Sequence, residues 1–243
     1  MISVAAVGDL HVGSDVRGHY RKHLTGIADR ADLLLVAGDL TRHGTVAEGR
    51  IAADELRDIG VPVVTVLGNH DYHSGAELEI AEVLRDAGVT VLEGNGTVVH
   101  CDGTRVGVAG GKGFGGGFAG RCASDFGEPE MKAFVGYTKS FAARLRHSLR
   151  SLDDADVRIS LTHYSPVKDT LAGEPPEIYP FLGSYLLAEA IDESDVALAV
   201  HGHAHKGTEK GVTPGGVRVR NVALPVIQQA YAVYRLSEAS GRR

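Results

Sequence analysis

Short runs of apolar and β-branched residues alternate with amphipathic stretches over the first ninety residues. The apolar runs are continuous rather than alternating, which is typical of strands buried on both faces. This part of the chain is therefore predicted to fold as βαβαβ. A helix over about 76–87 follows and ends at Gly88, because a glycine commonly follows the last turn of a helix. The predicted strands cover 2–7, 33–37 and 63–67, and the helices between them cover about 16–29 and 45–58.

The pattern changes after residue 88. Short apolar runs around an Asn95-Gly96 turn predict a meander of hairpins. Residues 103–127 contain ten glycines in twenty-five positions, which predicts a long loop. Beyond this loop the pattern predicts alternating helices and strands and a closing hairpin. The meander strands cover 89–92, 97–101 and 105–109; the later helices cover about 130–150 and 184–192, and the later strands cover 157–161, 196–200, 217–222 and 230–236.

Strands dominate both halves of the chain, with helices outside them. This arrangement predicts an α/β fold of four layers, α/β/β/α, in which two stacked mixed sheets are flanked by helices. The 243 residues, 43% of them hydrophobic, can bury a sizeable core. Because the chain has no repeat of solenoid period and no long polar linker, we expect a single domain over residues 1–243.

Composition narrows the class of protein. No window approaches twenty consecutive apolar residues, and Met1 leads directly into an apolar run without a basic flank, so we expect no spanning helix, no signal peptide and a cytoplasmic location. The net charge of −6 disfavours binding to nucleic acid or to an anionic membrane. Twelve histidines stand against two cysteines, Cys101 and Cys122, so any bound metal would be held through nitrogen and oxygen.

Polar side chains that could bind metal or take part in catalysis follow five of the predicted strands. In open α/β sheets, ligands bind outside the carboxyl ends of the strands, so these groups are expected to share one edge. The glycines beside them let a polar side chain turn sharply out of a buried strand. The five blocks are Gly8-Asp9-Leu10-His11, Gly38-Asp39-Leu40, Gly68-Asn69-His70-Asp71, Thr162-His163 and His201-Gly202-His203-Ala204-His205.

This edge would hold two aspartates, one asparagine and up to six histidines. So many buried ionisable groups are costly unless something compensates their charge. Oxygen and imidazole ligands without thiolate suit Mn, Fe, Zn or Co. The number of ligands is too large for one ion, whereas two ions about 3.5–4 Å apart, bridged by one carboxylate, would use them all.

In their order and spacing, the five blocks resemble those of the calcineurin-like metallophosphoesterase superfamily. They extend from residue 9 to residue 205, most of the chain. The resemblance implies a two-sheet core with helices on both outer faces and a binuclear metal site at one edge. It also implies a ligand set in which Asp9, His11 and His205 hold one ion, Asn69, His163 and His203 hold the other, and Asp39 bridges them.

The resemblance gives His70 a role other than metal binding. It would protonate the leaving alkoxide or stabilise the pentavalent transition state, and Asp71 is expected to orient its ring. Two divalent or mixed-valence ions, with Mn, Fe or Zn expected, would supply a bridging hydroxide that attacks phosphorus in line. Related phosphatases often place a phosphate-contacting arginine where His43 stands, so His43 and Arg42 are candidate substrate contacts.

Other residues have weaker assignments. His201 is interpreted as a hydrogen-bonded histidine at a strand end. His73 is interpreted as a residue that contacts the metal ligands without binding metal itself. Residues 110–127 are either a mobile flap over the metals or a loop that only packs on the fold. In a flap, the side chains available to hold substrate would be Lys112, Phe114, Phe118 and Arg121.

The leading functional hypothesis is a binuclear metal-dependent hydrolase of small phosphate esters, either diesters or monoesters, such as nucleotides. A DNA or RNA nuclease is an alternative, because the opening block Asp9-Leu10-His11-Val12-Gly13 is similar to that of repair exonucleases in the superfamily and because residues 130–150 are basic. A protein phosphatase is a weaker alternative, since the match fails at His43. A metal-stabilised binding protein without catalysis is the hypothesis from another class; the intact ligand positions and His70 speak against it.

Overall fold

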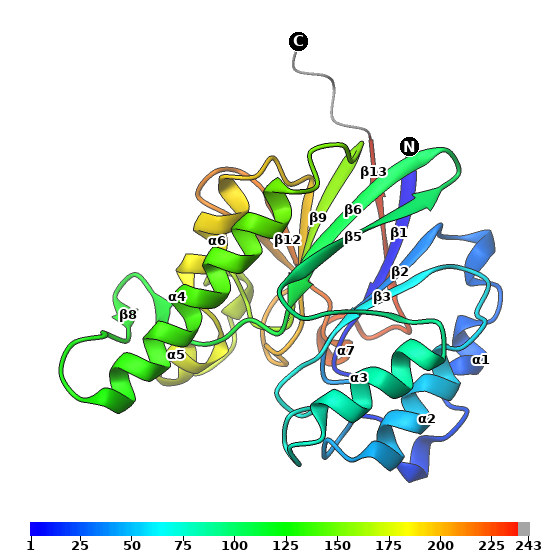
Figure 1. The fold of residues 1–243 in the computed structure, drawn as a ribbon, viewed down its shortest axis with the longest axis horizontal. Coiled ribbons are helices and arrows are strands. Elements are labelled where there is room, and N and C mark those ends of the chain that lie inside the picture. The colour runs from blue at the N-terminus through cyan, green and yellow to red at the C-terminus, as the bar shows by residue number, and fades with distance from the viewer. Residues whose placement is uncertain (238–243) are drawn as a thin grey trace.

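The computed structural model describes residues 1–237 and contains two stacked β-sheets with helices on both outer faces (Figure 1). Both sheets are mixed: the inner strands are parallel, and an antiparallel strand lies at one edge of the first sheet and at both edges of the second. The predicted fold class is therefore confirmed. The first sheet has the order β13 (Ala232–Leu236), β1 (Ile2–Val7), β2 (Leu33–Ala37), β3 (Val63–Val66), β4 (Thr90–Leu92), and the second has the order β11 (Lys210–Val212), β12 (Arg218–Asn221), β10 (Leu198–His201), β9 (Val157–Thr162), β6 (Thr104–Gly111), β5 (Asn95–Cys101).

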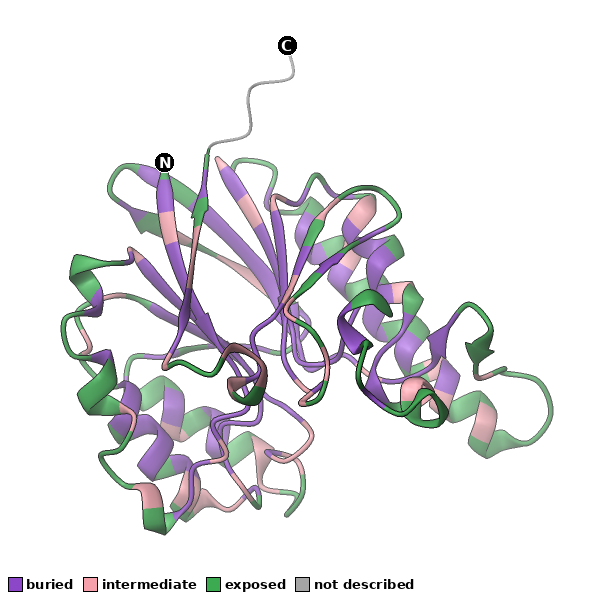
Figure 2. Ribbon diagram, turned by 180° about the vertical axis from the view of Figure 1, so that it is seen from behind, coloured by how far each residue is buried: buried purple, intermediate pink, exposed green. Residues whose placement is uncertain are grey.

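The central strands are buried on both faces, as their continuous apolar runs predict (Figure 2). In β2, Leu33 and Leu35 face the second sheet, where they join a cluster with Val106 and Ile159. Leu34, from the same strand, faces the helices instead. Alternate side chains of one strand thus fill two separate layers of the core, which explains why no polar residue interrupts the run.

Helices cover the outer face of each sheet. α2 and α3 pack on the first sheet, and α4 and α6 pack on the second. α2 begins with a capping box, in which Thr45 and Glu48 each accept a hydrogen bond from the other's backbone N–H. α3 ends before Gly88, whose φ of +84° is left-handed, as predicted. The helices are α1 (Arg21–Leu24), α2 (Val46–Leu56), α3 (Glu77–Asp86), α4 (Pro129–Arg150), α5 (Tyr179–Leu182), α6 (Tyr185–Asp192) and α7 (Leu224–Ile227).

Two predictions about local structure are wrong in the first half. The helix predicted over about 16–29 is broken into α1 and two 3-10 turns, because Gly18 and Gly26 adopt left-handed φ values of +74° and +77°. Asn95-Gly96 is not a turn but the start of β5. The chain crosses there from the first sheet to the second, so β4 and β5 are not a hairpin.

Two further predictions are wrong in the second half. The glycine-rich stretch 103–127 is not loop throughout, because its first part forms β6 and a later part forms the short hairpin of β7 (Gly117–Phe118) and β8 (Arg121–Cys122). The strands predicted near 217–222 and 230–236 do not pair with each other: β12 belongs to the second sheet and β13 to the first. Residues 238–243, the end of the predicted 1–243 domain, lie outside the described residues.

The parallel strands of both sheets end at the same edge of the molecule, since loop residues after β1 and β10 contact each other there. The His203 backbone N–H donates to both carboxylate oxygens of Asp9, at 3.1 and 3.0 Å. Among residues 1–237, no helix is long and apolar enough to cross a membrane.

Candidate metal centre

The backbone of the loops at this edge is strained. Asp9, His11, Asp39 and His203 have φ values of +59°, +45°, +50° and +69°. Residues other than glycine rarely adopt positive φ, and such strain is concentrated at functional sites. The loops therefore hold these four side chains in positions that a relaxed strand end would not give them.

Glycines in the motif blocks make room for the carboxylates. A Cβ atom on Gly68 would lie 2.1 Å from Oδ1 of Asp39, and one on Gly202 would lie 2.4 Å from Oδ2 of Asp9. Neither separation is possible between real atoms. The close approach of the neighbouring loops therefore requires glycine at both positions.

The structure brings together the side chains that the sequence predicts as ligands. Potential ligand atoms of Asp9, His11, Asp39 and His205 form one group within 4.8 Å, and those of Asp39, His163 and His203 form a second. Asp39 is common to both groups. The Oδ1 atom of Asn69 lies 2.9 Å from Nε2 of His163 and so belongs beside the second group.

The donors fit divalent metal ions. Nε2 of His11 lies 3.7 Å from Oδ2 of Asp39, and Nε2 of His163 lies 3.4 Å from Oδ1 of the same carboxylate. The His11 Nε2 atom is buried and has no hydrogen-bond partner among the described residues. A buried polar atom without a partner is costly, and a metal ion would provide one. Nitrogen and oxygen donors in this number suit Mn, Fe or Zn.

Burial changes the protonation of these groups. Desolvation, together with the charges of Asp9 and Asp71, raises the pKa of Asp39 to about 9. Desolvation lowers the pKa of His11 to about 4 and that of His203 to about 3, and it lowers the pKa of His163 well below its usual range. The three imidazoles are therefore neutral at pH 7 and have lone pairs available for a cation, which would also compensate the buried carboxylates.

Comparison with known proteins identifies the family. A family model described as calcineurin-like phosphoesterase matches residues 2–207. The chain belongs to this family. The resemblance seen in the five sequence blocks is thereby confirmed, and with it the assignment to metal-binding phosphoester hydrolases.

Solved structures share the fold of this phosphoesterase. A phosphopantetheinyl hydrolase from Mycobacterium tuberculosis is 18% identical with a TM-score of 0.73, over 98% of this chain and 98% of that protein. The protein TT1561 of Thermus thermophilus is 17% identical with a TM-score of 0.58, over 90% of this chain and 88% of that protein. No curated protein matches the sequence. At these identities, the structural likeness shows the fold alone.

Backbone carbonyl groups orient two histidines of the phosphoesterase. Nδ1 of His163 donates to the carbonyl oxygen of Ala37 at 2.8 Å, which leaves Nε2 facing Asp39 and Asn69. Nδ1 of His70 donates to the carbonyl oxygen of Arg42, also at 2.8 Å. Since a carbonyl can only accept, Nδ1 of each ring carries a proton and Nε2 is the nitrogen left for chemistry.

The prediction that Asp71 orients His70 is wrong. Asp71 is fully buried, and its carboxylate accepts hydrogen bonds from the backbone N–H groups of Leu40, Thr41 and Gly68 and from the Thr41 hydroxyl, at 2.6–3.2 Å. Burial raises the pKa of Asp71, and these hydrogen bonds oppose that shift. Asp71 therefore joins the loops after β2 and β3. The Arg42 carbonyl group, and not Asp71, orients the His70 ring.

The two candidate substrate contacts have partners within the protein. Arg42 forms an ion pair with Asp15 at 3.0 Å, and it is near enough to His11 to lower the pKa of that imidazole slightly. Nδ1 of His43 lies 2.8 Å from Oε1 of Glu48, in the capping box of α2. His43 is thus held at the helix, whereas Arg42 lies at the rim of the centre. Neither assignment as a substrate contact is tested by these contacts.

Histidines near the motif blocks have structural roles. His201 is buried, as expected of a hydrogen-bonded histidine at a strand end: Nε2 lies 2.8 Å from the Thr170 hydroxyl oxygen, and Nδ1 lies 2.7 Å from the Gly202 carbonyl oxygen. For His73, the structure shows a backbone hydrogen bond to the His70 carbonyl oxygen. The prediction that its ring reaches the ligands' surroundings stays a prediction.

The segment predicted as a flap is attached to the fold along its first part. Gly116 and Gly117 donate to the carbonyl groups of Pro180 and Gly183. Phe118 is buried in a small cluster with Leu182, and its role as a substrate contact stays a prediction. Beyond β7 the chain is exposed and lies beside the start of α4 (Figure 1). Mobility of residues 110–127 stays a prediction.

Sequence reasoning named Lys112 only among the side chains that a flap over the metals could offer to substrate. Lys112 follows β6 directly, and β6 is a sixth parallel strand that ends at this edge. Burial lowers the pKa of Lys112 to about 8. The pattern of a strand followed by glycines and a charged residue, here Gly110-Gly111-Lys112, repeats that of the metal-ligand blocks and could have identified it.

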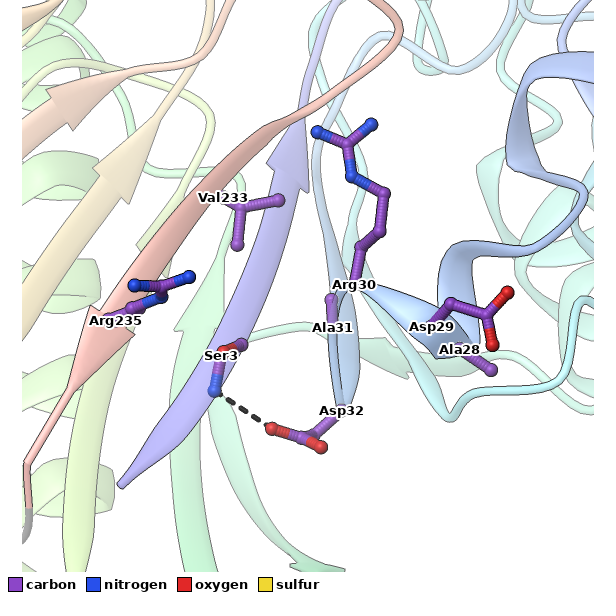
Figure 3. A pocket seen from close by; sticks show the side chains of 8 residues that line it. All are labelled: Ser3, Ala28, Asp29, Arg30, Ala31, Asp32, Val233 and Arg235. Atoms are coloured by element: carbon purple, nitrogen blue, oxygen red, sulfur yellow. Dashed lines mark hydrogen bonds between the residues drawn. The ribbon is translucent and has the colours of Figure 1, made fainter.

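A hollow of about 530 Å³ lies at the opposite edge of the first sheet (Figure 3). The backbone N–H of Ser3 donates there to Asp32 at 2.8 Å. None of the predicted ligands contributes to this hollow, so it is separate from the candidate metal centre. It is lined by Ser3, Ala28, Asp29, Arg30, Ala31, Asp32, Val233 and Arg235.

Proposed function

We propose that this phosphoesterase is a binuclear metal-dependent hydrolase of small phosphate esters, nucleotides among them. The observation that carries the proposal is the pair of ligand groups that share Asp39. One carboxylate common to two groups is the arrangement that two ions require of a bridging ligand. Asp9, His11 and His205 would hold one ion with Asp39, and Asn69, His163 and His203 would hold the other. We also propose that the enzyme acts in the cytoplasm.

The residues of the chain divide the work of hydrolysis. Divalent ions would polarise the phosphoryl group and provide the attacking hydroxide. Nε2 of His70 would carry the proton to the leaving alkoxide, because Nδ1 is committed to the Arg42 carbonyl group. The ring of His70 lies 4.5 Å from that of His11, between centroids, which places it beside the first ligand group. This distance supports a direct role for His70 at the phosphoryl group.

Aromatic side chains beside the second ligand group support a planar organic group on the substrate. The Tyr164 ring lies 4.4 Å from that of His203, and the Phe114 ring lies 5.8 Å from that of Tyr164. Phe181, whose backbone carbonyl accepts from Nε2 of His203, is 60% exposed. Tyr164 itself is buried, but an exposed aromatic ring such as that of Phe181 next to a polar site is typical of a ligand-binding surface. A nucleobase has a shape and polarity that such rings accept.

The nuclease alternative has less support. Three of the five lysines and arginines on α4 are paired with acidic residues, namely Lys139 with Asp125 and both Arg146 and Arg150 with Glu193. Lys132 and Arg144 form no ion pair among the described residues. A helix face that binds a phosphate backbone needs cations free of such partners. Together with the net charge of −6, these ion pairs favour a small substrate over nucleic acid.

A hydrolysis screen tests the proposal, read by released phosphate for monoesters, by released chromophore for chromogenic esters and by chromatography for cyclic nucleotides. Purified protein with Mn²⁺ is expected to hydrolyse members of a panel that contains chromogenic mono- and diesters, nucleoside monophosphates, cyclic nucleotides and phosphopantetheine. Asp39→Asn should lose nearly all of this turnover, because it removes the only charge that both ligand groups share. Asp29→Asn, an exposed aspartate at the opposite edge, is the matched control and should keep full turnover.

Metal content is measured beside activity by elemental analysis. Two bound ions in the wild type and fewer in Asp39→Asn are expected. If the protein binds two ions yet hydrolyses no ester of the panel, the hydrolase proposal is rejected, and a metal-stabilised binding protein takes its place.

A further inference from the structure

Lys112 lies at the metal edge although it belongs to none of the five motif blocks. β6 pairs in parallel with β9, with Gly111 opposite Thr162, so the residues after the two strands are neighbours. The backbone N–H groups of His163 and Tyr164 donate to the Lys112 carbonyl oxygen at 3.1 and 3.0 Å. The backbone of Lys112 is therefore hydrogen-bonded directly to that of His163, a member of the second ligand group.

Four aromatic rings surround the Lys112 ammonium group. They come from four separate parts of the chain: the loop after β3, the segment after β6, helix α4 and the loop after β9. All four centroids lie within the range of a favourable cation–π contact. The distances from Nζ are 4.8 Å to Phe114, 4.9 Å to Tyr72, 5.2 Å to Tyr137 and 5.3 Å to Tyr164.

This cation has little hydrogen bonding from the protein. Lys112 is only 6% exposed, and its ammonium donates one long hydrogen bond, of 3.4 Å, to the Gly113 carbonyl oxygen. Within residues 1–237 no carboxylate lies within 4.0 Å of Nζ; the nearby Glu93 accepts from the Tyr72 hydroxyl instead. An ammonium has three N–H donors. The aromatic rings stabilise its positive charge but do not replace the oxygen acceptors that these donors need. A buried cation with so few hydrogen bonds lowers the stability of the fold, and such groups are concentrated at functional sites.

We propose that Lys112 is a substrate-binding residue whose ammonium contacts an anionic oxygen of the substrate's phosphate group, an inference that rests on the proposed function. The aromatic rings hold the ammonium in one place and leave its N–H donors for that oxygen. Lys112 also stands beside His163, so a phosphate held at the metal edge would lie close to its side chain. The exposed Tyr137 ring, which covers the ammonium on the α4 side, is the one that would move to admit the ester.

Calorimetric binding of inorganic phosphate to the Mn²⁺-loaded protein tests the assignment. Lys112→Met keeps the length and the apolar stem of the side chain but removes the charge, and phosphate should bind at least tenfold more weakly. For a hydrolysed ester, KM should rise by a similar factor while kcat changes less. Lys210→Met, which removes an exposed lysine on β11, is the matched control and should change neither value.

Thermal unfolding separates this role from a structural one. Lys112→Met should unfold at the same temperature as the wild type or at a higher one, because the substitution removes a buried charge. Lys112→Gln repeats both measurements with a polar, uncharged head group. If both variants bind phosphate and substrate as the wild type does, the assignment is wrong while the proposed function stands. Lower unfolding temperatures with loss of bound Mn²⁺ would also overturn it, in favour of a structural cation.

The inference and the proposed function fail in different ways. A wild type that binds phosphate but hydrolyses no ester refutes the proposed function. The Lys112 assignment then stands if Lys112→Met weakens phosphate binding, and it falls if that affinity is unchanged.

Discussion

The two sheets contribute different kinds of side chain to the candidate metal centre. Loops after the first sheet's strands provide both carboxylates, Asp9 and Asp39, and the amide of Asn69, together with His11. Loops after the second sheet's strands provide only imidazoles, those of His163, His203 and His205. All of the negative charge therefore comes from one sheet, and the other adds imidazoles, one of which, His205, has its pKa raised by its hydrogen bond to Asp9.

This difference would give a bound metal ion a structural role. Within the first sheet the buried carboxylates repel each other, which contributes to the raised pKa of Asp39. Across the sheets, the contacts at this edge are a few hydrogen bonds, such as that between Nε2 of His205 and Asp9 at 2.8 Å. A cation that binds both sets of ligands neutralises the first sheet and ties it to the second.

Removing charge from the first sheet should have the largest effect. Asp9→Asn is expected to lower metal-dependent turnover by about 10³, equivalent to about 4 kcal/mol. Asp9 is buried, and it accepts hydrogen bonds from both His205 and the His203 backbone, so its loss disturbs both ligand groups. His205→Asn removes a partly exposed imidazole from the second sheet and should cost about tenfold less. Steady-state kinetics at saturating Mn²⁺ compare the two, and equal losses would contradict the division between the sheets.

Metal removal should lower the stability of the folded protein. An ion present at a hundredfold its Kd adds about 2.7 kcal/mol to the free energy of unfolding, and a second ion adds as much again. For a chain of this size, each kcal/mol raises Tm by about 2–4 °C. Calorimetry with and without a chelator measures the shift. Asp39→Asn, which takes the shared charge from the first sheet, should show most of the shift abolished; an undiminished shift in that variant would place the ions elsewhere.

The sequence predicts which side chains meet at this edge because each motif block is local. A buried parallel strand ends, a glycine follows, and the polar residue comes next, as in Gly38-Asp39 and Gly202-His203. Parallel strands then bring their ends together without further information. The buried β1, β2 and β3 are predicted for a similar reason, since continuous apolar runs mark them individually.

Features that depend on distant parts of the chain were not predictable. The aromatic surroundings of Lys112 combine residues from 72 to 164, and no single stretch of sequence contains them. The crossing at Asn95 between the sheets is another case, because a local pattern gives a strand but not the sheet to which it belongs. The partner of His70 is a backbone carbonyl, whose direction depends on the loop conformation and leaves no mark in the sequence.

Substitution of Asp71 should have the smallest effect on turnover. It separates a residue that stabilises the loops of the first sheet from residues that take part in the reaction. Because its carboxylate joins the loops after β2 and β3 by four hydrogen bonds, Asp71→Asn is expected to lower the free energy of unfolding by about 1–3 kcal/mol. Urea denaturation with Mn²⁺ present measures this loss, and the exposed Asp86→Asn on α3 is its control. Turnover by the folded variant should fall far less than in His70→Ala, since the His70 ring is held by the Arg42 carbonyl. Unchanged stability with turnover as low as that of His70→Ala would return Asp71 to the catalytic machinery.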